Sequence, residues 1–330
     1  MAEDKTPYRN LGPEAILDAV ESIGYRCDGS LLALNSFENR VYQVGIEEGD
    51  GLVAKFYRAN RWSNEAILEE HHFSQELADL EIPVIPPLAL DDGATLHAHA
   101  TFRFALYPRR GGRAPDLENS DHLKQLGRFL GRIHAAGAVT EFAERPTLDI
   151  ASFGEASMVF LLESGFIPLE LETPYRTLAE DLLSRIRASF DAAGSVNLIR
   201  LHGDCHPGNI LWTDAGPHFV DFDDARRGPA IQDLWMCLSG ERADRTAQLG
   251  DLLEGYGQFY DFDPRELLLI EALRTLRMMH YAAWIARRWE DPAFPRAFPW
   301  FNNGRYWDEH ILSLREQASM MEERPLEWMG

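Results

Sequence analysis

Short apolar runs rich in β-branched and aromatic residues recur through the first third of the chain, a pattern typical of β-strands. The clearest runs lie at residues 41–44, 52–57 and 101–107. Residues 13–24 instead place apolar side chains at helical spacing, and a second helical pattern covers residues 65–80. This part of the chain is therefore predicted to form a small antiparallel sheet accompanied by two helices.

Helical periodicity dominates the rest of the chain. Apolar residues recur at spacings of three and four within residues 118–136, and a similar long stripe covers residues 264–289. Residues 151–190 predict further helices, and we expect these to be broken at Pro168 and Pro174 because proline interrupts helical hydrogen bonding. The second part of the chain is thus expected to be mainly helical.

The boundary between the two parts is predicted near residue 108. The last strand pattern stops at Pro108, and the following RRGGR run has the glycine content of a flexible crossing. We therefore expect an α+β protein with two lobes. The first, at residues 1–108, would hold the antiparallel sheet, and the second, at residues 109–330, would be mainly helical.

The densest polar chemistry lies in one stretch, LHGDCHPGNILWTDAGPHFVDFDD, at residues 201–224. Its two apolar runs, 210–212 and 218–220, are short enough for strands, and residues 213–217 between them have turn composition. A hairpin would bring the polar residues at its two ends together. In chain order, those residues include Asp204, Asn209 and Asp221.

These three side chains suit phosphoryl transfer. That reaction needs a carboxylate beside the accepting hydroxyl, and an amide oxygen and a second carboxylate to hold magnesium against the nucleotide phosphates. We expect Asp204 to serve the hydroxyl, and Asn209 and Asp221 to bind Mg²⁺, which prefers hard oxygen ligands. The roles of Asp223 and Asp224, which follow directly, stay open.

The spacing H-G-D-x-H-x-x-N at residues 202–209, followed by V-D-F-D at 220–223, resembles the signatures of the aminoglycoside phosphotransferase and choline kinase group, relatives of protein kinases. Further segments extend the resemblance over nearly the whole chain, toward bacterial serine/threonine protein kinases within that group. These segments are LNSFENRVYQV, DDARRGPAIQDLW and ARRWEDPAFPRAFPWF. The resemblance implies a protein-kinase-like fold, use of ATP with Mg²⁺, and Asp204 and Asp221 as catalytic residues.

The same resemblance assigns nucleotide-binding residues in the first lobe. The V-A-K run ending at Lys55 resembles the kinase strand whose lysine holds the α- and β-phosphates, and Glu70 matches the glutamate that positions it. Leu106 and Tyr107 would form the hinge whose backbone holds adenine. No glycine occurs from residue 31 to 44, so the usual glycine-rich loop is replaced, and Ser36 is carried over from the related kinases.

Composition narrows the setting of this chemistry. The formal charge of −21 over 330 residues argues against general binding of nucleic acid or anionic membranes. Three widely spaced cysteines suit a reducing cytoplasm, and the start MAEDKTPYRN lacks the apolar core of a signal peptide. We expect a cytoplasmic protein without a membrane anchor, and take a monomer as the default.

Other functions stay open at this point. The acceptor could be Ser/Thr on a protein or a small hydroxylated molecule, because kinases for both share the phosphate and metal motifs. A catalytically inactive nucleotide-binding scaffold is a third possibility. A zinc hydrolase is a fourth, since nitrogen and oxygen ligands of the right kind occur at His97, His99, His202, Asp204 and His206.

Overall fold

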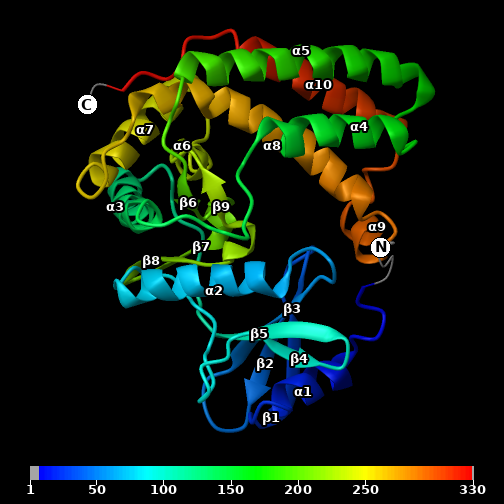
Figure 1. Cartoon of the computed structure of the whole chain (residues 1–330), viewed down its shortest axis with the longest axis vertical. Helices are drawn as coiled ribbons and strands as arrows, with labels where there is room; N and C mark the ends of the chain where they lie inside the picture. Colours follow the sequence, from blue (N-terminus) through cyan, green and yellow to red (C-terminus); the bar gives the residue numbers. More distant parts are fainter. Residues whose placement is uncertain (1–6, 329–330) are drawn as a thin grey trace. The chain divides into compact units, whose positions relative to one another are not determined.

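The computed structural model describes residues 7–328. Residues 1–6, which belong to the N-terminal segment predicted to lack a signal peptide, lie outside the described residues. The chain divides into two compact units. One, here called the sheet unit, holds the described residues through Pro115 together with residues 143–145 and 207–225. The other, the helical unit, holds the remaining residues. The predicted α+β fold with two lobes is confirmed, whereas the lobe boundary at residue 108 stays a prediction (Figure 1).

A five-stranded antiparallel sheet forms the centre of the sheet unit, with the order β1-β2-β3-β5-β4. The strands are β1 (Cys27–Ala33), β2 (Arg40–Ile46), β3 (Leu52–Tyr57), β4 (His97–His99) and β5 (Phe102–Pro108). Ala54 and Phe56 of β3 pack in one core with Val20 of helix α1 (Pro13–Glu21). Because side chains alternate along a strand, Lys55 and Tyr57 point to the opposite sheet face.

Helix α2 (Asn64–Asp79) covers that opposite face, where its Ile67 packs with Tyr57. The helix begins at a favourable cap, because the hydroxyl of Ser63 accepts a hydrogen bond from the N–H of Ala66. Glu70, one turn further along, is buried. The sequence of β3 and α2 therefore places one buried lysine and one buried glutamate in the same layer.

The predicted hairpin is confirmed, as β7 (Ile210–Thr213) paired with β8 (Gly216–Phe219). It belongs to the sheet unit, where the backbone of Phe219 bonds to residues 83 and 85 and that of Trp212 bonds to Arg113. These bonds hold both strands of the hairpin, and at its open end the N–H of Val220 donates to the carbonyl oxygen of Asn209.

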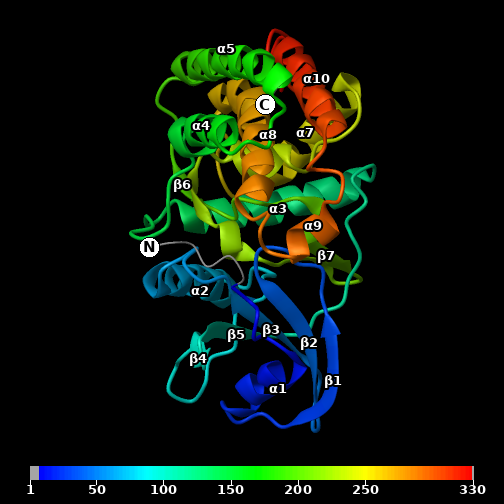
Figure 2. The same cartoon turned by 90° about the vertical axis from the view of Figure 1, so that its right-hand side faces the viewer.

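Helices make up most of the helical unit (Figures 1 and 2). They are α3 (Ser120–Gly137), α4 (Ala156–Glu163), α5 (Leu169–Ala193), α6 (Ile231–Trp235), α7 (Arg242–Tyr256), α8 (Ile270–Arg287), α9 (Ala293–Ala297) and α10 (Gly304–Met320). A short strand pair, β6 (Ile199–Leu201) with β9 (Arg226–Gly228), joins them. Helix α8 packs against α4, α5 and α10 and forms the centre of this unit.

Two details of the helical unit depend on single residues. The predicted break at Pro174 is wrong, because α5 runs through it and loses only the hydrogen bond that proline cannot donate. Helices α3 and α7 approach closely through glycines: a methyl group on Gly127 would meet the carbonyl oxygen of Leu252 at 1.9 Å. Among the described residues, no helix is long and apolar enough to cross a membrane.

Candidate active site

The buried ammonium group of Lys55 lies at the centre of an acidic cluster in the sheet unit, formed by Glu70, Asp221 and Asp223. Lys55 is 5% exposed, and its Nζ lies 2.9 Å from Asp221 Oδ1, 3.3 Å from Asp223 Oδ1 and 3.7 Å from Glu70 Oε1. Burial alone would lower the pKa of Lys55, but the three carboxylates raise it well above its usual value. The side chain therefore stays a cation.

Glu70 is held from its other side by Arg145, which the sequence did not identify. Arg145 Nη2 lies 2.9 Å from Glu70 Oε2, and the same guanidinium donates to the carbonyl oxygens of Ala66 and Asp223. The neighbouring Glu69 instead accepts hydrogen bonds from the backbone N–H groups of residues 143–145. Of these two adjacent acids, the structure thus places Glu70 beside Lys55.

Asp221 stands at the open end of the β7–β8 hairpin, next to Asn209. The N–H of Val220 donates to the carbonyl oxygen of Asn209 at 3.0 Å, which joins the two ends. Asp221 has φ 61°, a left-handed conformation that is uncommon outside glycine and that turns its carboxylate toward Lys55. Its side chain remains 49% exposed, so the carboxylate can also reach a ligand.

Asn209 and Asp221 have the chemistry that a hard divalent cation requires, an amide oxygen and a carboxylate. The half-exposed Asp221 leaves room for phosphate oxygens and water in the same shell. The described residues contain no group of three His, Cys, Asp or Glu side chains arranged to hold a metal ion, and the zinc alternative gains no support from them.

Asp223 and Asp224 both pair with cations, and Asp223 is buried. Asp223 is 4% exposed and contacts both Lys55 and the guanidinium of Arg61, while Arg61 Nη2 donates to Asp224 Oδ1 at 2.8 Å. Burial alone would raise the pKa of Asp223, but Arg61 and Lys55 have the larger effect, so the pKa lies below its usual value. Asp223 therefore stays ionised and contributes to fixing Lys55.

Ser36 lies in the β1–β2 loop, which holds its shape through side chains. Its hydroxyl donates to the carbonyl oxygen of Asn39 at 3.2 Å, and Asn39 Oδ1 accepts from the N–H of Arg58. Glu38 forms an ion pair with Arg58 at 3.0 Å. These bonds replace the freedom of a glycine-rich loop with a fixed polar turn, and the role of Ser36 at a nucleotide stays a prediction.

Leu106 and Tyr107 lie within β5, opposite Ala54 and Val53 of β3. The carbonyl oxygen of Leu106 already accepts a hydrogen bond from the N–H of Leu88 at 2.7 Å. The hydroxyl groups of Tyr107 and Tyr57 are 2.9 Å apart. Both residues are therefore well fixed, and their assignment as an adenine-binding hinge stays a prediction.

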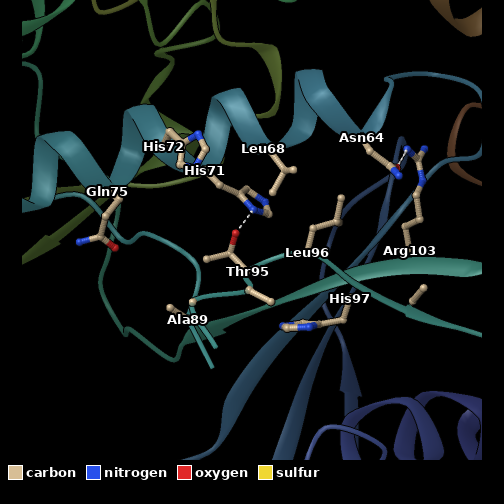
Figure 3. Close-up of a pocket in the computed structure, with 13 residues that line it drawn as sticks. Asn64, Leu68, His71, His72, Gln75, Ala89, Thr95, Leu96, His97 and Arg103 are labelled. Atoms are coloured by element: carbon tan, nitrogen blue, oxygen red, sulfur yellow. Dashed lines mark hydrogen bonds between the residues drawn. The ribbon is translucent and has the colours of Figure 1, made fainter. Parts of the chain in front are cut away.

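A cavity of about 510 Å³ lies between α2 and the segment from Ala89 to Arg103 (Figure 3). His71 forms part of its wall, with Nδ1 2.8 Å from the hydroxyl of Thr95 and Nε2 2.7 Å from the hydroxyl of Tyr57. Burial lowers the pKa of His71 to about 3, so the imidazole is neutral. Lys55 and Asp221 do not line this cavity, which is separate from the acidic cluster.

Asp204 belongs to the helical unit, on the loop after β6. Its Oδ1 lies 2.5 Å from Nη1 of Arg277 on α8, and its Oδ2 lies 3.6 Å from Nε2 of His206. The loop is anchored by the buried Asp233, whose carboxylate accepts from the N–H groups of residues 202 and 203 at 2.9 Å each. The sequence singled out Asp204 but gave no sign that Arg277 contacts it.

Within the sheet unit, the structure brings Lys55, Glu70 and Asp221 together. Three arginines that touch this cluster or Asp204 were not assigned from the sequence: Arg61, Arg145 and Arg277. Each is a single charged residue without a surrounding motif, so only the tertiary contacts identify it.

Comparison with known proteins agrees with this chemistry. Residues 30–270 match the family described as "Phosphotransferase enzyme family". The chain is 43% identical to Stress response kinase A of Escherichia coli O157:H7 over 97% of this chain and 96% of that protein. It is 42% identical to Serine/threonine protein kinase RdoA of Salmonella typhimurium over 99% and 98% of the two chains.

Solved structures of low sequence identity share the fold. One is the amicoumacin kinase hAmiN in complex with AMP-PNP, Ca²⁺ and Ami, with a TM-score of 0.73, 18% identity and coverage of 96% and 95% of the two chains. Another is a microcompartment-associated aminopropanol kinase, with a TM-score of 0.70, 16% identity and coverage of 93% and 98%. The resemblance predicted from the sequence motifs is confirmed.

Proposed function

Because this chain belongs to the phosphotransferase enzyme family, we propose that it is a serine/threonine protein kinase that uses ATP and Mg²⁺. The choice of a protein acceptor is supported by the relatives of about two-fifths identity, whose names are Stress response kinase A and Serine/threonine protein kinase RdoA. The first name also supports a role in stress response. We place the protein in the cytoplasm, since its few dispersed cysteines suit a reducing compartment.

The observation that carries the proposal is the buried ammonium of Lys55 between Glu70 and Asp221. A buried cation held on two sides cannot rotate freely, so it offers a fixed positive charge to the α- and β-phosphates. Arg145 holds Glu70 in turn, which keeps the lysine in place when no nucleotide is bound. Ser36, Leu106 and Tyr107 would complete nucleotide binding from the loop and the strand.

Asn209 and Asp221 would hold Mg²⁺ at the open end of the hairpin. When bound, the ion neutralises charge on the phosphates and stabilises the loose transition state of phosphoryl transfer. Asp221 would hold the ion through its half-exposed carboxylate, which also contacts Lys55. The donors match the preference of Mg²⁺ for hard oxygen ligands.

Asp204 would orient the acceptor hydroxyl. The hydroxyl oxygen forms a bond to the γ-phosphorus, the bond from that phosphorus to the bridging oxygen of ADP breaks, and the hydroxyl proton passes to the Asp204 carboxylate. Only four residues lie between Asp204 and Asn209 in the sequence, so their Cα atoms are at most about 18 Å apart. The covalent connection is short enough for both residues to serve one reaction.

Transfer of a radiolabelled γ-phosphate from ATP tests the proposal. The purified protein would be incubated with Mg²⁺ and either a serine-rich protein or a panel of small alcohols that includes an aminoglycoside, choline and aminopropanol. We expect label on protein serine or threonine, including the kinase itself. Label on a small alcohol alone would favour a small-molecule kinase, and ATP binding without any transfer would favour an inactive scaffold.

A further inference from the structure

Helix α8 has a basic face in a strongly acidic protein. The whole chain carries a formal charge of −21, yet α8 and its C-cap residue Arg288 together contain four arginines and one glutamate. Residues three and four positions apart lie on the same face of a helix. Five such residues form a surface that we call the α8 stripe. The stripe consists of Arg274, Arg277, Tyr281, Trp284 and Arg288, and none of the five is buried.

Arg277 connects this stripe to the carboxylate of Asp204. Its Nη1 lies 2.5 Å from Asp204 Oδ1, yet 40% of the arginine side chain stays exposed. A guanidinium has five N–H donors, so one contact leaves others for an arriving group. An acceptor with a cationic group near its hydroxyl meets a like charge at this position, whereas one with a carboxylate can pair with Arg277.

Exposed aromatic rings continue the surface away from Asp204. Tyr281 is 42% exposed and stacks on Trp284 with ring centroids 5.7 Å apart. Tyr281 also contacts the ring of Phe298, which contacts Trp300, itself 44% exposed. Arginine beside large exposed aromatic side chains is the composition of protein-binding surfaces.

The length of the stripe indicates what kind of molecule binds. The rise of an α-helix gives about 21 Å from residue 274 to residue 288. A small alcohol covers only part of that distance, whereas an extended peptide of about six or seven residues covers all of it. The charge and the length together favour a polypeptide with acidic side chains.

We propose that the α8 stripe binds an acidic polypeptide segment that carries the acceptor hydroxyl, with Arg277 pairing with the acidic side chain nearest to that hydroxyl. This inference rests on the proposed function, because it names the substrate class of the same site. Arg274 and Arg288 then contact further acidic groups, and Tyr281 and Trp284 pack against the apolar parts of the segment.

Two peptides of equal length test the inference, one with a single serine between glutamates and one with the same serine between lysines. The enzyme should phosphorylate the glutamate peptide with kcat/KM at least about tenfold higher, as two close charge contacts predict. Arg277→Glu should reverse this preference. The readout is the ratio between peptides, because the new carboxylate beside Asp204 also affects the absolute rate.

Arg287→Glu is the matched control on the same helix. Arg287 lies off the stripe, where its guanidinium covers the ring of Phe160 and donates to the carbonyl oxygen of Ala156. This variant should keep the preference of the unmodified enzyme. Equal kcat/KM for both peptides, or a preference that Arg287→Glu changes as much as Arg277→Glu, would overturn the inference.

Binding separates the inference from the proposed function. Fluorescent versions of both peptides with alanine in place of serine cannot be phosphorylated, so they report binding alone. Fluorescence anisotropy should show that the acidic peptide binds more tightly than the basic one, and Arg277→Glu should abolish this difference. Equal binding of the two peptides alongside normal transfer would overturn only the inference. Selective binding of the acidic peptide without transfer to any serine would refute the proposed function.

Discussion

Lys55→Met removes the cation at the centre of the acidic cluster while keeping a side chain of similar volume. At an effective dielectric constant near 20, its ion pairs with the buried Glu70 and Asp223 each correspond to about 5 kcal/mol of Coulomb attraction before the cost of desolvation is subtracted, and solvent weakens the pair with the half-exposed Asp221. Each of the three carboxylates keeps another contact in the variant. Glu70 still pairs with Arg145, Asp223 still pairs with Arg61, and Asp221 is half exposed to water. The variant should therefore lose only about 1–3 kcal/mol of stability, less than a typical broken buried pair.

The effect on nucleotide binding should be larger. Two charge-assisted contacts from the ammonium to phosphates contribute about 3 kcal/mol together, which corresponds to about a hundredfold change in Kd. Calorimetric titration with an ATP analogue and Mg²⁺ measures this change directly, and thermal unfolding of the same samples measures the loss of stability. The variant should stay folded at the temperature of the titration.

Lys124→Met provides the control for the chemical change itself. Lys124 lies on α3, where its ammonium is 3.0 Å from Glu254 near the surface. Its replacement should leave the Kd for nucleotide unchanged. If Lys55→Met bound the analogue within about threefold of the unmodified protein, a contact between this lysine and the phosphates would be refuted, because losing it should cost about 3 kcal/mol.

Two further predictions concern stability. Gly127→Ala should destabilise the protein by about 2–4 kcal/mol, because the new methyl group meets the Leu252 carbonyl oxygen, whereas Gly250→Ala in α7, with open space around it, should stabilise by about 0.5–1 kcal/mol. Thermal unfolding measures both, and equal shifts would contradict the packing argument. Burial raises the pKa of Glu266 from 4.5 to about 7, although the carboxylate accepts from the N–H of Ile231. The folded state thus holds the proton more tightly than the unfolded chain, and stability is lost as pH rises from about 4.5 to 7. Glu266→Gln should remove this loss. Urea unfolding should show that the free energy of unfolding of the variant, relative to that of the unmodified protein, rises by up to about 3 kcal/mol between pH 4 and pH 8. A difference that stays constant over this range would contradict the raised pKa of Glu266.

The elements that carry the site were predictable where local patterns are strong. Lys55 lies between apolar residues of its strand, a pattern that predicts burial of the strand. A buried ammonium group is costly unless it pairs with carboxylates, so acidic partners could be expected. The hairpin at 210–219 followed from two short apolar runs and a turn. In both places, local propensity and the long-range contacts favour the same structure.

Other features could not be derived because their cause is tertiary. The strand β1 shows mostly exposed positions, and β4 has only three residues, so neither has a clear periodic signal. Arg145 and Arg277 are isolated arginines whose partners lie about seventy residues away in the sequence. Pro174 suggests a break, yet packing of α5 against its neighbours maintains the helix despite the missing hydrogen bond.

The Asp204→Asn variant tests the proposed phosphotransferase mechanism most directly. Asp204→Asn keeps the shape of the side chain but removes the carboxylate that accepts the proton, and Asp214→Asn makes the same change in the exposed hairpin turn. Transfer of γ-phosphate to a protein hydroxyl should fall by about a thousandfold in the first variant and stay unchanged in the second, while both bind nucleotide normally. Full transfer activity in Asp204→Asn would contradict the proposed phosphotransferase mechanism.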